Sequence, residues 1–139
     1  MSRLLKADQI DQYKKDGAVL IKGKFDRAWI ENLRKGISKD FQNPSPRFVR
    51  HTKDNDAPGY FEDFWTWNLF DEFTDFVHKS PTAQIASELM SASQVNLVMD
   101  NWFLREAGSK SGAPFHHDIS YFDFEMLLLP PPKQYIQAQ

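Results

Sequence analysis

Apolar positions in the first part of the chain recur every three or four residues, which is the period of an amphipathic helix. This spacing predicts a helix over 7–16, which Gly17 ends, and a second helix that starts after Asp26, a residue that caps helix N-termini well. The buried face of the second helix is expected to consist of Trp29, Ile30, Leu33 and Ile37. A third helix is predicted to open at Ser80 and Pro81, with the serine as N-cap.

Shorter apolar runs predict strands. Residues 18–21 form a compact apolar run, and residues 94–105 alternate loosely and contain Val, Leu, Trp and Phe. A flexible loop is expected over 106–114, followed by another strand over 115–124. Helices thus come first and strands last, an order that predicts an α+β or mainly β fold with N-terminal helices.

Three further segments lack such a clear period. The polar stretch 43–59 contains three prolines and is predicted to be loop. The aromatic cluster over 60–76 is predicted to be helical, with a mixed period. Residues 126–139 begin with an apolar run, continue with three prolines and end polar, a pattern from which we expect an atypical tail, either frame-shifted or disordered.

Composition narrows the classes of function. The chain has 139 residues, enough for one domain, and 41% hydrophobic with 26% charged residues is typical of soluble globular proteins. A net charge of -2 without a basic run gives no case for nucleic-acid or membrane partners. The absence of cysteine excludes disulfides, zinc–thiolate sites and thiol nucleophiles. Because the N-terminus is polar and lacks an apolar signal region, we expect a cytoplasmic protein.

The densest chemical signal is the run His116, His117 and Asp118. On a strand, side chains two positions apart point to the same side, so His116 and Asp118 are expected to face one point while His117 faces away. One imidazole and one carboxylate are two arms of the facial triad that holds non-heme iron(II). The alternative is a surface histidine beside an aspartate that caps the backbone.

The surroundings of this run resemble the phytanoyl-CoA dioxygenase family, whose members are iron(II)- and 2-oxoglutarate-dependent oxygenases. That family has an apolar strand, a basic residue followed shortly by glycine, a variable loop, and a Pro-Trp-His-x-Asp-x-x-Tyr-Trp type motif. The matching residues are Arg105, Gly108, Pro114, Phe115, His116, Asp118, Tyr121 and Phe122. Phenylalanine stands at two positions where tryptophan is common. The resemblance to the family covers residues 7–124 in the order of elements, but only residues 95–122 in the specific motif.

The resemblance implies roles for five residues. His116 and Asp118 correspond to the first two iron(II) ligands, and the aspartate points to hydroxylation because related halogenases carry a small residue there. Arg105 is either a basic residue that binds a carboxylate of 2-oxoglutarate or substrate through its guanidinium fork, or a solvated arginine at a strand end. Asn101 lies on the same strand face by period 2 and is a second candidate for the co-substrate pocket. Tyr121 either donates a hydrogen bond to the co-substrate or packs in the interior.

The implied fold is a double-stranded β-helix, a cupin-like jelly roll, with N-terminal helices. Residues 1–125 would be the N-terminal part of that oxygenase domain, and the chain is expected to be truncated or a fragment. The family places a third ligand histidine and a 2-oxoglutarate-binding arginine downstream, whereas this chain has no histidine after His117 and no arginine after Arg105. The implied activity is hydroxylation of a small organic substrate.

Two other classes of function stay open. The first is a non-catalytic, aromatic-rich binding module or an inactive truncated product, in which His116 and Asp118 are merely structural. The second is a cupin-type metal hydrolase or isomerase, although such proteins usually bring more histidines in their first motif. Iron binding by His116 and Asp118 distinguishes the oxygenase from the binding module.

Overall fold

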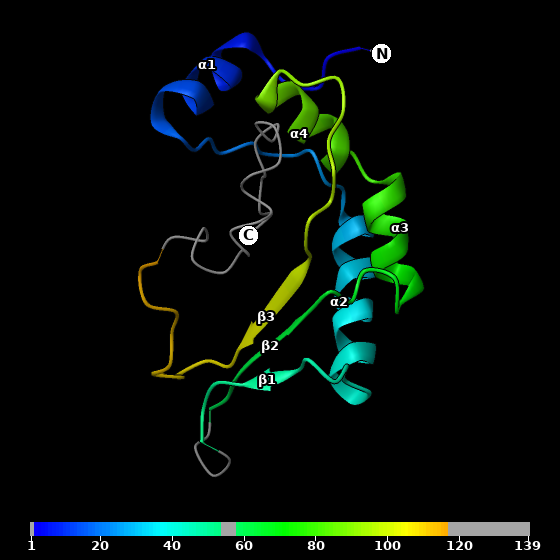
Figure 1. The fold of residues 1–139 in the computed structure, drawn as a ribbon, viewed down its shortest axis with the longest axis vertical. Coiled ribbons are helices and arrows are strands. Elements are labelled where there is room, and N and C mark those ends of the chain that lie inside the picture. Colours follow the sequence, from blue (N-terminus) through cyan, green and yellow to red (C-terminus); the bar gives the residue numbers. More distant parts are fainter. Residues whose placement is uncertain (1, 54–57, 117–139) are drawn as a thin grey trace, which may run out of the picture.

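The computed structural model describes residues 2–53 and 58–116. In these residues the chain forms four helices and three strands, in the order α1 (Ala7–Asp16), α2 (Arg27–Gln42), β1 (Val49–Arg50), β2 (Tyr60–Phe64), α3 (Asp71–Lys79), α4 (Thr82–Met90) and β3 (Asn101–Arg105). Helices α2 and α3 lie beside the sheet, while α1 and α4 lie together at one end of the molecule (Figure 1). No helix within the described ranges combines the length and apolar character that crossing a membrane requires.

The predicted helices are confirmed, and their ends follow from local hydrogen bonds. Gly17 ends α1 in the left-handed conformation, with φ 74°, and its N–H donates to the Tyr13 carbonyl at 2.9 Å. The Asp26 carboxylate caps α2 by accepting the Trp29 N–H at 3.0 Å. The helix that was predicted to open at Ser80 is α4, which begins slightly later, at Thr82. Ser80 is instead the C-cap of α3, and its hydroxyl accepts the Thr82 N–H at 3.3 Å.

The prediction of a helix throughout 60–76 is wrong for its first part. Tyr60–Phe64 forms the central strand β2, and the helix α3 begins only at Asp71. The aromatic residues here are good strand formers, and pairing with β3 decides their conformation. Trp65 ends the strand in the left-handed region, with φ 54°. The predicted loop over 43–59 likewise contains the short strand β1.

The predicted strand over 18–21 is also wrong. This run pairs with no strand, and Val19 and Ile21 instead pack on the cluster of Leu5, Ile10 and Leu89 between α1 and α4. Val19 and Ile21 are only partly buried and Leu20 is 74% exposed, and the apolar sequence of such a short run does not distinguish this arrangement from a buried strand.

The strand predicted over 94–105 is confirmed only for Asn101–Arg105. Its partner β2 has five residues, and the last strand pair joins Phe64 to Asn101, beyond which the Trp65 N–H donates to the Asp100 carbonyl at 2.9 Å. Phe115 and His116 lie in no strand, and the remainder of the strand predicted over 115–124 lies outside the described residues, as does the tail over 126–139.

The three strands pair antiparallel in the order β1-β2-β3. One side of this sheet packs on α2 and α3 through buried Phe61, Phe73 and Trp102, with Leu33 and Ile37 of α2 against them. The predicted α+β class is confirmed. Within residues 2–53 and 58–116 the sheet does not close, and these residues do not show the two facing sheets of a jelly roll.

Candidate functional site

Strand register places two predicted site residues on the open side of the sheet. Residues paired directly across antiparallel strands point to the same side. Phe103 pairs with Glu62, and by alternation Asn101 and Arg105 point to that side too, whereas Trp102 points into the core. The prediction that Asn101 and Arg105 share a strand face is therefore confirmed.

Glu62 lies at the centre of this open side. One of its carboxylate oxygens is 2.8 Å from Nε2 of His51, and the other is 3.5 Å from the Asn101 amide nitrogen. The His51 ring lies on the Tyr60 ring with centroids 4.8 Å apart, and Tyr60 in turn contacts Phe103. A polar row thus crosses the sheet from the end of β1 to β3, with aromatic rings beside it.

Neither Glu62 nor His51 is among the site residues predicted from the sequence. Both residues gain their place from the strand pairing of β1 and β2. The signal that was present is the alternation within Tyr60–Phe64, where Glu62 stands directly between the buried Phe61 and Asp63. Because residues 60–76 were predicted to be helical, this alternation was not interpreted as a strand.

Arg105 holds the loop that leads to His116. Its guanidinium donates to the Ser109 carbonyl at 2.8 Å, and its Nη1 lies 3.8 Å from the position of a Cβ on Gly112. The next residue, Glu106, binds back to Gly59 through both its backbone N–H and its carboxylate. Arg105 is thus an exposed residue at the end of β3 that also contacts the following loop, and its binding of a carboxylate stays a prediction.

His116 is exposed, and its ring is oriented by the backbone. Its Nδ1 lies 2.7 Å from the Pro114 carbonyl oxygen. A carbonyl only accepts, so Nδ1 is the donor in this bond. Metal-binding histidines are commonly held by such a bond from one ring nitrogen, so this contact is compatible with His116 as an iron ligand.

The other two predicted site residues, Asp118 and Tyr121, lie outside the described residues, and so does His117. In the part of the chain that is described, no three side chains among His, Asp and Glu are grouped to hold a metal ion. The pair of His51 and Glu62 therefore lacks a third ligand there, and a metal centre depends on His116 with Asp118.

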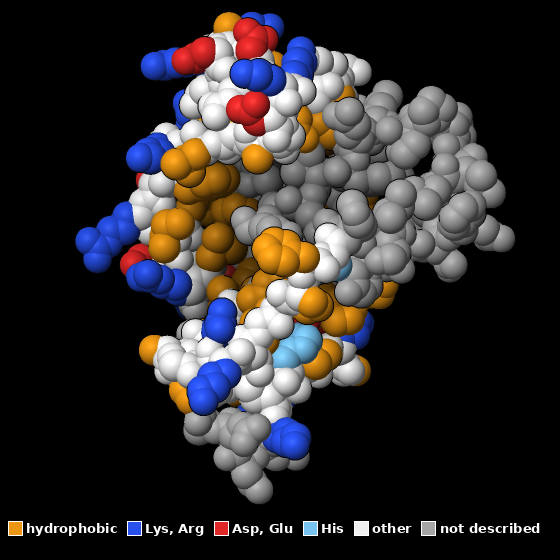
Figure 2. Space-filling model, turned by 90° about the vertical axis from the view of Figure 1, so that its left-hand side faces the viewer, with side chains coloured by type: hydrophobic (Ala, Val, Ile, Leu, Met, Phe, Trp, Pro, Cys, Tyr) orange, Lys and Arg blue, Asp and Glu red, His pale blue; other side chains and the backbone are white. Residues whose placement is uncertain are grey.

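The open side of the molecule carries exposed apolar side chains. Figure 2 shows hydrophobic side chains gathered in the middle of the side that faces left in Figure 1. Val49 and Phe103, which both pair with Glu62 and so point to this side, are exposed, Phe103 by 47%. Such a patch beside polar groups is typical of a ligand or protein contact surface.

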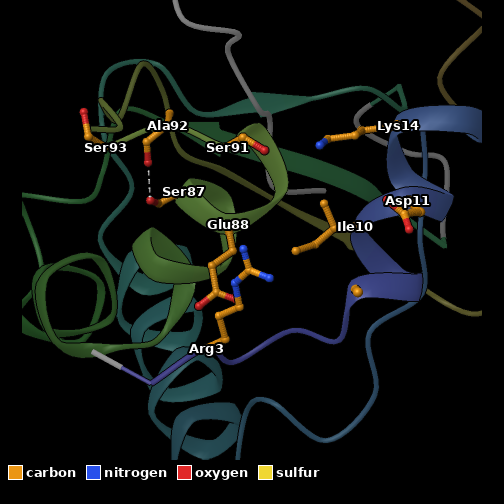
Figure 3. Close-up of a pocket in the computed structure, with 10 residues that line it drawn as sticks. Arg3, Ile10, Asp11, Lys14, Ser87, Glu88, Ser91, Ala92 and Ser93 are labelled. Carbon is orange, nitrogen blue, oxygen red and sulfur yellow. Dashed lines mark hydrogen bonds between the residues drawn. The ribbon is translucent and has the colours of Figure 1, made fainter.

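A separate pocket of about 560 Å³ lies between α1 and α4 (Figure 3). Its walls carry cations and acids together, among them Arg3, Lys14 and Glu88. The Glu88 carboxylate accepts the backbone N–H groups of Leu4 and Leu5, which hold the pKa of Glu88 below its usual range. This carboxylate thereby attaches the N-terminal segment to α4, a structural role.

Comparison with known proteins gave no match to any family model, any curated protein or any solved structure.

Proposed function

We propose that the chain belongs to an iron(II)- and 2-oxoglutarate-dependent oxygenase of the phytanoyl-CoA dioxygenase type, which hydroxylates a small organic substrate. The observation that carries the proposal is the contact of His116 Nδ1 with the Pro114 carbonyl oxygen at 2.7 Å, which orients the imidazole ring two residues before Asp118. Asp118, two residues on, would supply the carboxylate. Iron(II) bound there would activate oxygen, and the protein would supply ligands and orientation.

Arg105 and Asn101 support the same proposal from β3. Both point to the open side of the sheet, and Arg105 also contacts the loop that ends at His116. A guanidinium in this position suits a carboxylate of 2-oxoglutarate or of substrate, because its planar fork matches a carboxylate in two parallel hydrogen bonds. Tyr121 is a further candidate for contact with the co-substrate.

The proposed fold is a jelly roll in which β1, β2 and β3 form part of one sheet. Helices α2 and α3 already cover one side of these strands through Phe61, Phe73 and Trp102. The second sheet would face the open side that carries Glu62, Asn101 and Arg105. Such an arrangement would enclose the polar row between two sheets, where a small substrate is shielded from water.

Anaerobic titration with iron(II), followed by calorimetry, tests the proposal. We expect His116→Ala and Asp118→Ala each to weaken iron binding by at least about tenfold, because each removes one of the two proposed ligands. His78→Ala is the matched control, since His78 ends α3 and its ring contacts Trp67. Equal iron affinity in all four proteins would exclude His116 and Asp118 as the ligands.

A non-catalytic binding module is the second candidate, and the exposed aromatic side chains favour it. Trp65 is 50% exposed, with the Arg47 guanidinium 6.0 Å from its ring centroid, and Phe103 is nearly as exposed. Succinate formed from 2-oxoglutarate only in the presence of iron(II) would support the oxygenase. A chain that binds no iron and forms no succinate would support the binding module.

A further inference from the structure

Two fully buried carboxyl groups meet where α2 packs on the sheet. Asp40 lies in α2 and Asp63 lies in β2, and both side chains have 0% exposure. The Trp102 indole N–H of β3 donates to Asp40 Oδ2 at 2.7 Å. The two acids therefore join a helix to two strands inside the core, where a charge without a partner is costly.

The hydrogen bonds of this pair leave one oxygen without a donor. Asp63 Oδ1 accepts the Ser45 hydroxyl at 2.6 Å and the Phe64 N–H at 2.8 Å, and Asp63 Oδ2 accepts the Ser45 N–H at 2.9 Å. Asp40 Oδ2 accepts the indole of Trp102, whereas Asp40 Oδ1 has no partner. A proton on this oxygen would turn it into a donor toward the Asp63 carboxylate and satisfy it.

Electrostatics point to Asp40 as the group that holds the proton. Burial raises the pKa of Asp40 from 3.8 to about 6, and the charge of Asp63 and a hydrogen bond between the two carboxyl groups act in the same direction. The indole of Trp102 and the Ser45 N–H oppose this rise in pKa but do not reverse it.

The other charges on the elements that pack around the pair have different partners. Glu72 of α3 binds Lys35 and Lys39 of α2, at 3.0 and 2.6 Å. The Arg50 guanidinium of β1 lies 5.1 Å from the centroid of the Phe61 ring. The charged group that acts on Asp40 from the sheet is therefore Asp63.

We propose that Asp40 and Asp63 share one proton and form a pH-sensitive clamp between α2 and the sheet. With the proton in place, Asp40 donates to Asp63 and accepts from Trp102, so α2, β2 and β3 are tied together. Loss of the proton leaves two adjacent buried carboxylates, which repel each other. The clamp does not depend on iron binding, although it anchors the strand that carries Asn101 and Arg105.

The clamp makes folding stability fall as pH rises. The folded state holds this proton more tightly than the unfolded chain, whose aspartate has an ordinary pKa of 3.8. The stabilisation is therefore complete below pH 3.8 and is lost as pH rises through about 6. Each unit of difference in pKa changes the unfolding equilibrium constant tenfold. Loss of the Asp40 proton should therefore raise this constant by roughly 100-fold in total, from pH values below 3.8 to pH values well above 6.

Urea unfolding of the full chain at pH 5 and pH 8 tests the clamp through Asp40→Asn. The asparagine amide can donate to Asp63 while its oxygen accepts from Trp102, so the variant should lose most of the difference in stability between the two pH values. Asp75→Asn is the control, because Asp75 is a surface partner of Lys79 and its replacement should leave the difference unchanged. An unchanged pH difference in Asp40→Asn would overturn the proposal.

NMR of the unaltered chain gives an answer that does not depend on the variant folding. We expect the Asp40 carboxyl ¹³C resonance to titrate near pH 6, together with the indole N–H resonance of Trp102. An Asp40 midpoint near 3.8, with no response of the Trp102 indole, would show that no proton is shared and would overturn the clamp.

Discussion

At the scale of single residues, the direction in which the pKa of a buried acid shifts in this fold depends on the groups beside it. Asp40 lies next to another acid, which together with burial raises its pKa to about 6. Glu72 is also buried, yet hydrogen bonds from Lys39 and Lys35 outweigh burial and lower its pKa to about 2. The two acids therefore affect stability with opposite dependence on pH.

We predict that the stabilisation from Glu72 is present above pH 4.5 and is lost as pH falls toward 2, because its carboxylate is favoured in the folded state. Glu72→Gln should lower stability at neutral pH by only about 1 kcal/mol, since solvent screens exposed lysines. The side chains of Lys35 and Lys39 are 66% and 48% exposed. The measurement is urea unfolding at pH 7 and pH 3, and an equal loss at both values would contradict this assignment.

At the scale of elements, α2 and α3 approach closely because Gly36 has no side chain. A Cβ at this position would lie 2.6 Å from Cε1 of Phe73 and 3.1 Å from Cβ of Glu72. Glycine lowers helix propensity, so its presence in the middle of α2 reflects packing and not helix formation.

Gly36→Ala should therefore destabilise the protein, although alanine is the better helix former. We expect overlap with the Phe73 ring to cost about 1–3 kcal/mol and the better helix propensity to recover about 1 kcal/mol, so the net loss of stability is up to about 2 kcal/mol. Ser38→Ala is the control in the same helix, at an exposed position. Urea unfolding of both variants measures the difference, and a Gly36→Ala protein more stable than the parent would contradict the close approach.

The elements that the sequence predicted well are those with strong local signals. Helix α1 and the start of α2 follow from Gly17 and Asp26, whose contacts are with residues three or four positions away. Strand β2 was missed because its conformation depends on pairing with β3, some 40 residues later. The polar row around Glu62 was missed for the same reason, since only strand pairing brings His51 and Asn101 to it.

At the scale of the whole molecule, β3 connects the core to the candidate site. Trp102 points inward to Asp40 and the cluster under α2, while its neighbours Asn101 and Phe103 point outward. The contacts that fix Trp102 therefore also fix the position of Arg105 and of the loop it holds. On this account, an iron ion at His116 lies close to the open side of the sheet.

Paramagnetic NMR tests this central claim most directly. Cobalt(II), added as a paramagnetic substitute for iron(II), should broaden the resonances of His116 and Asp118 first and those of Asn101 and Arg105 next. Resonances of α1 and α4, which lie away from the three-stranded sheet in Figure 1, should be affected less than those of Asn101 and Arg105. Broadening centred on His51 and Glu62 or on His78, with His116 unaffected, would contradict the proposed iron site.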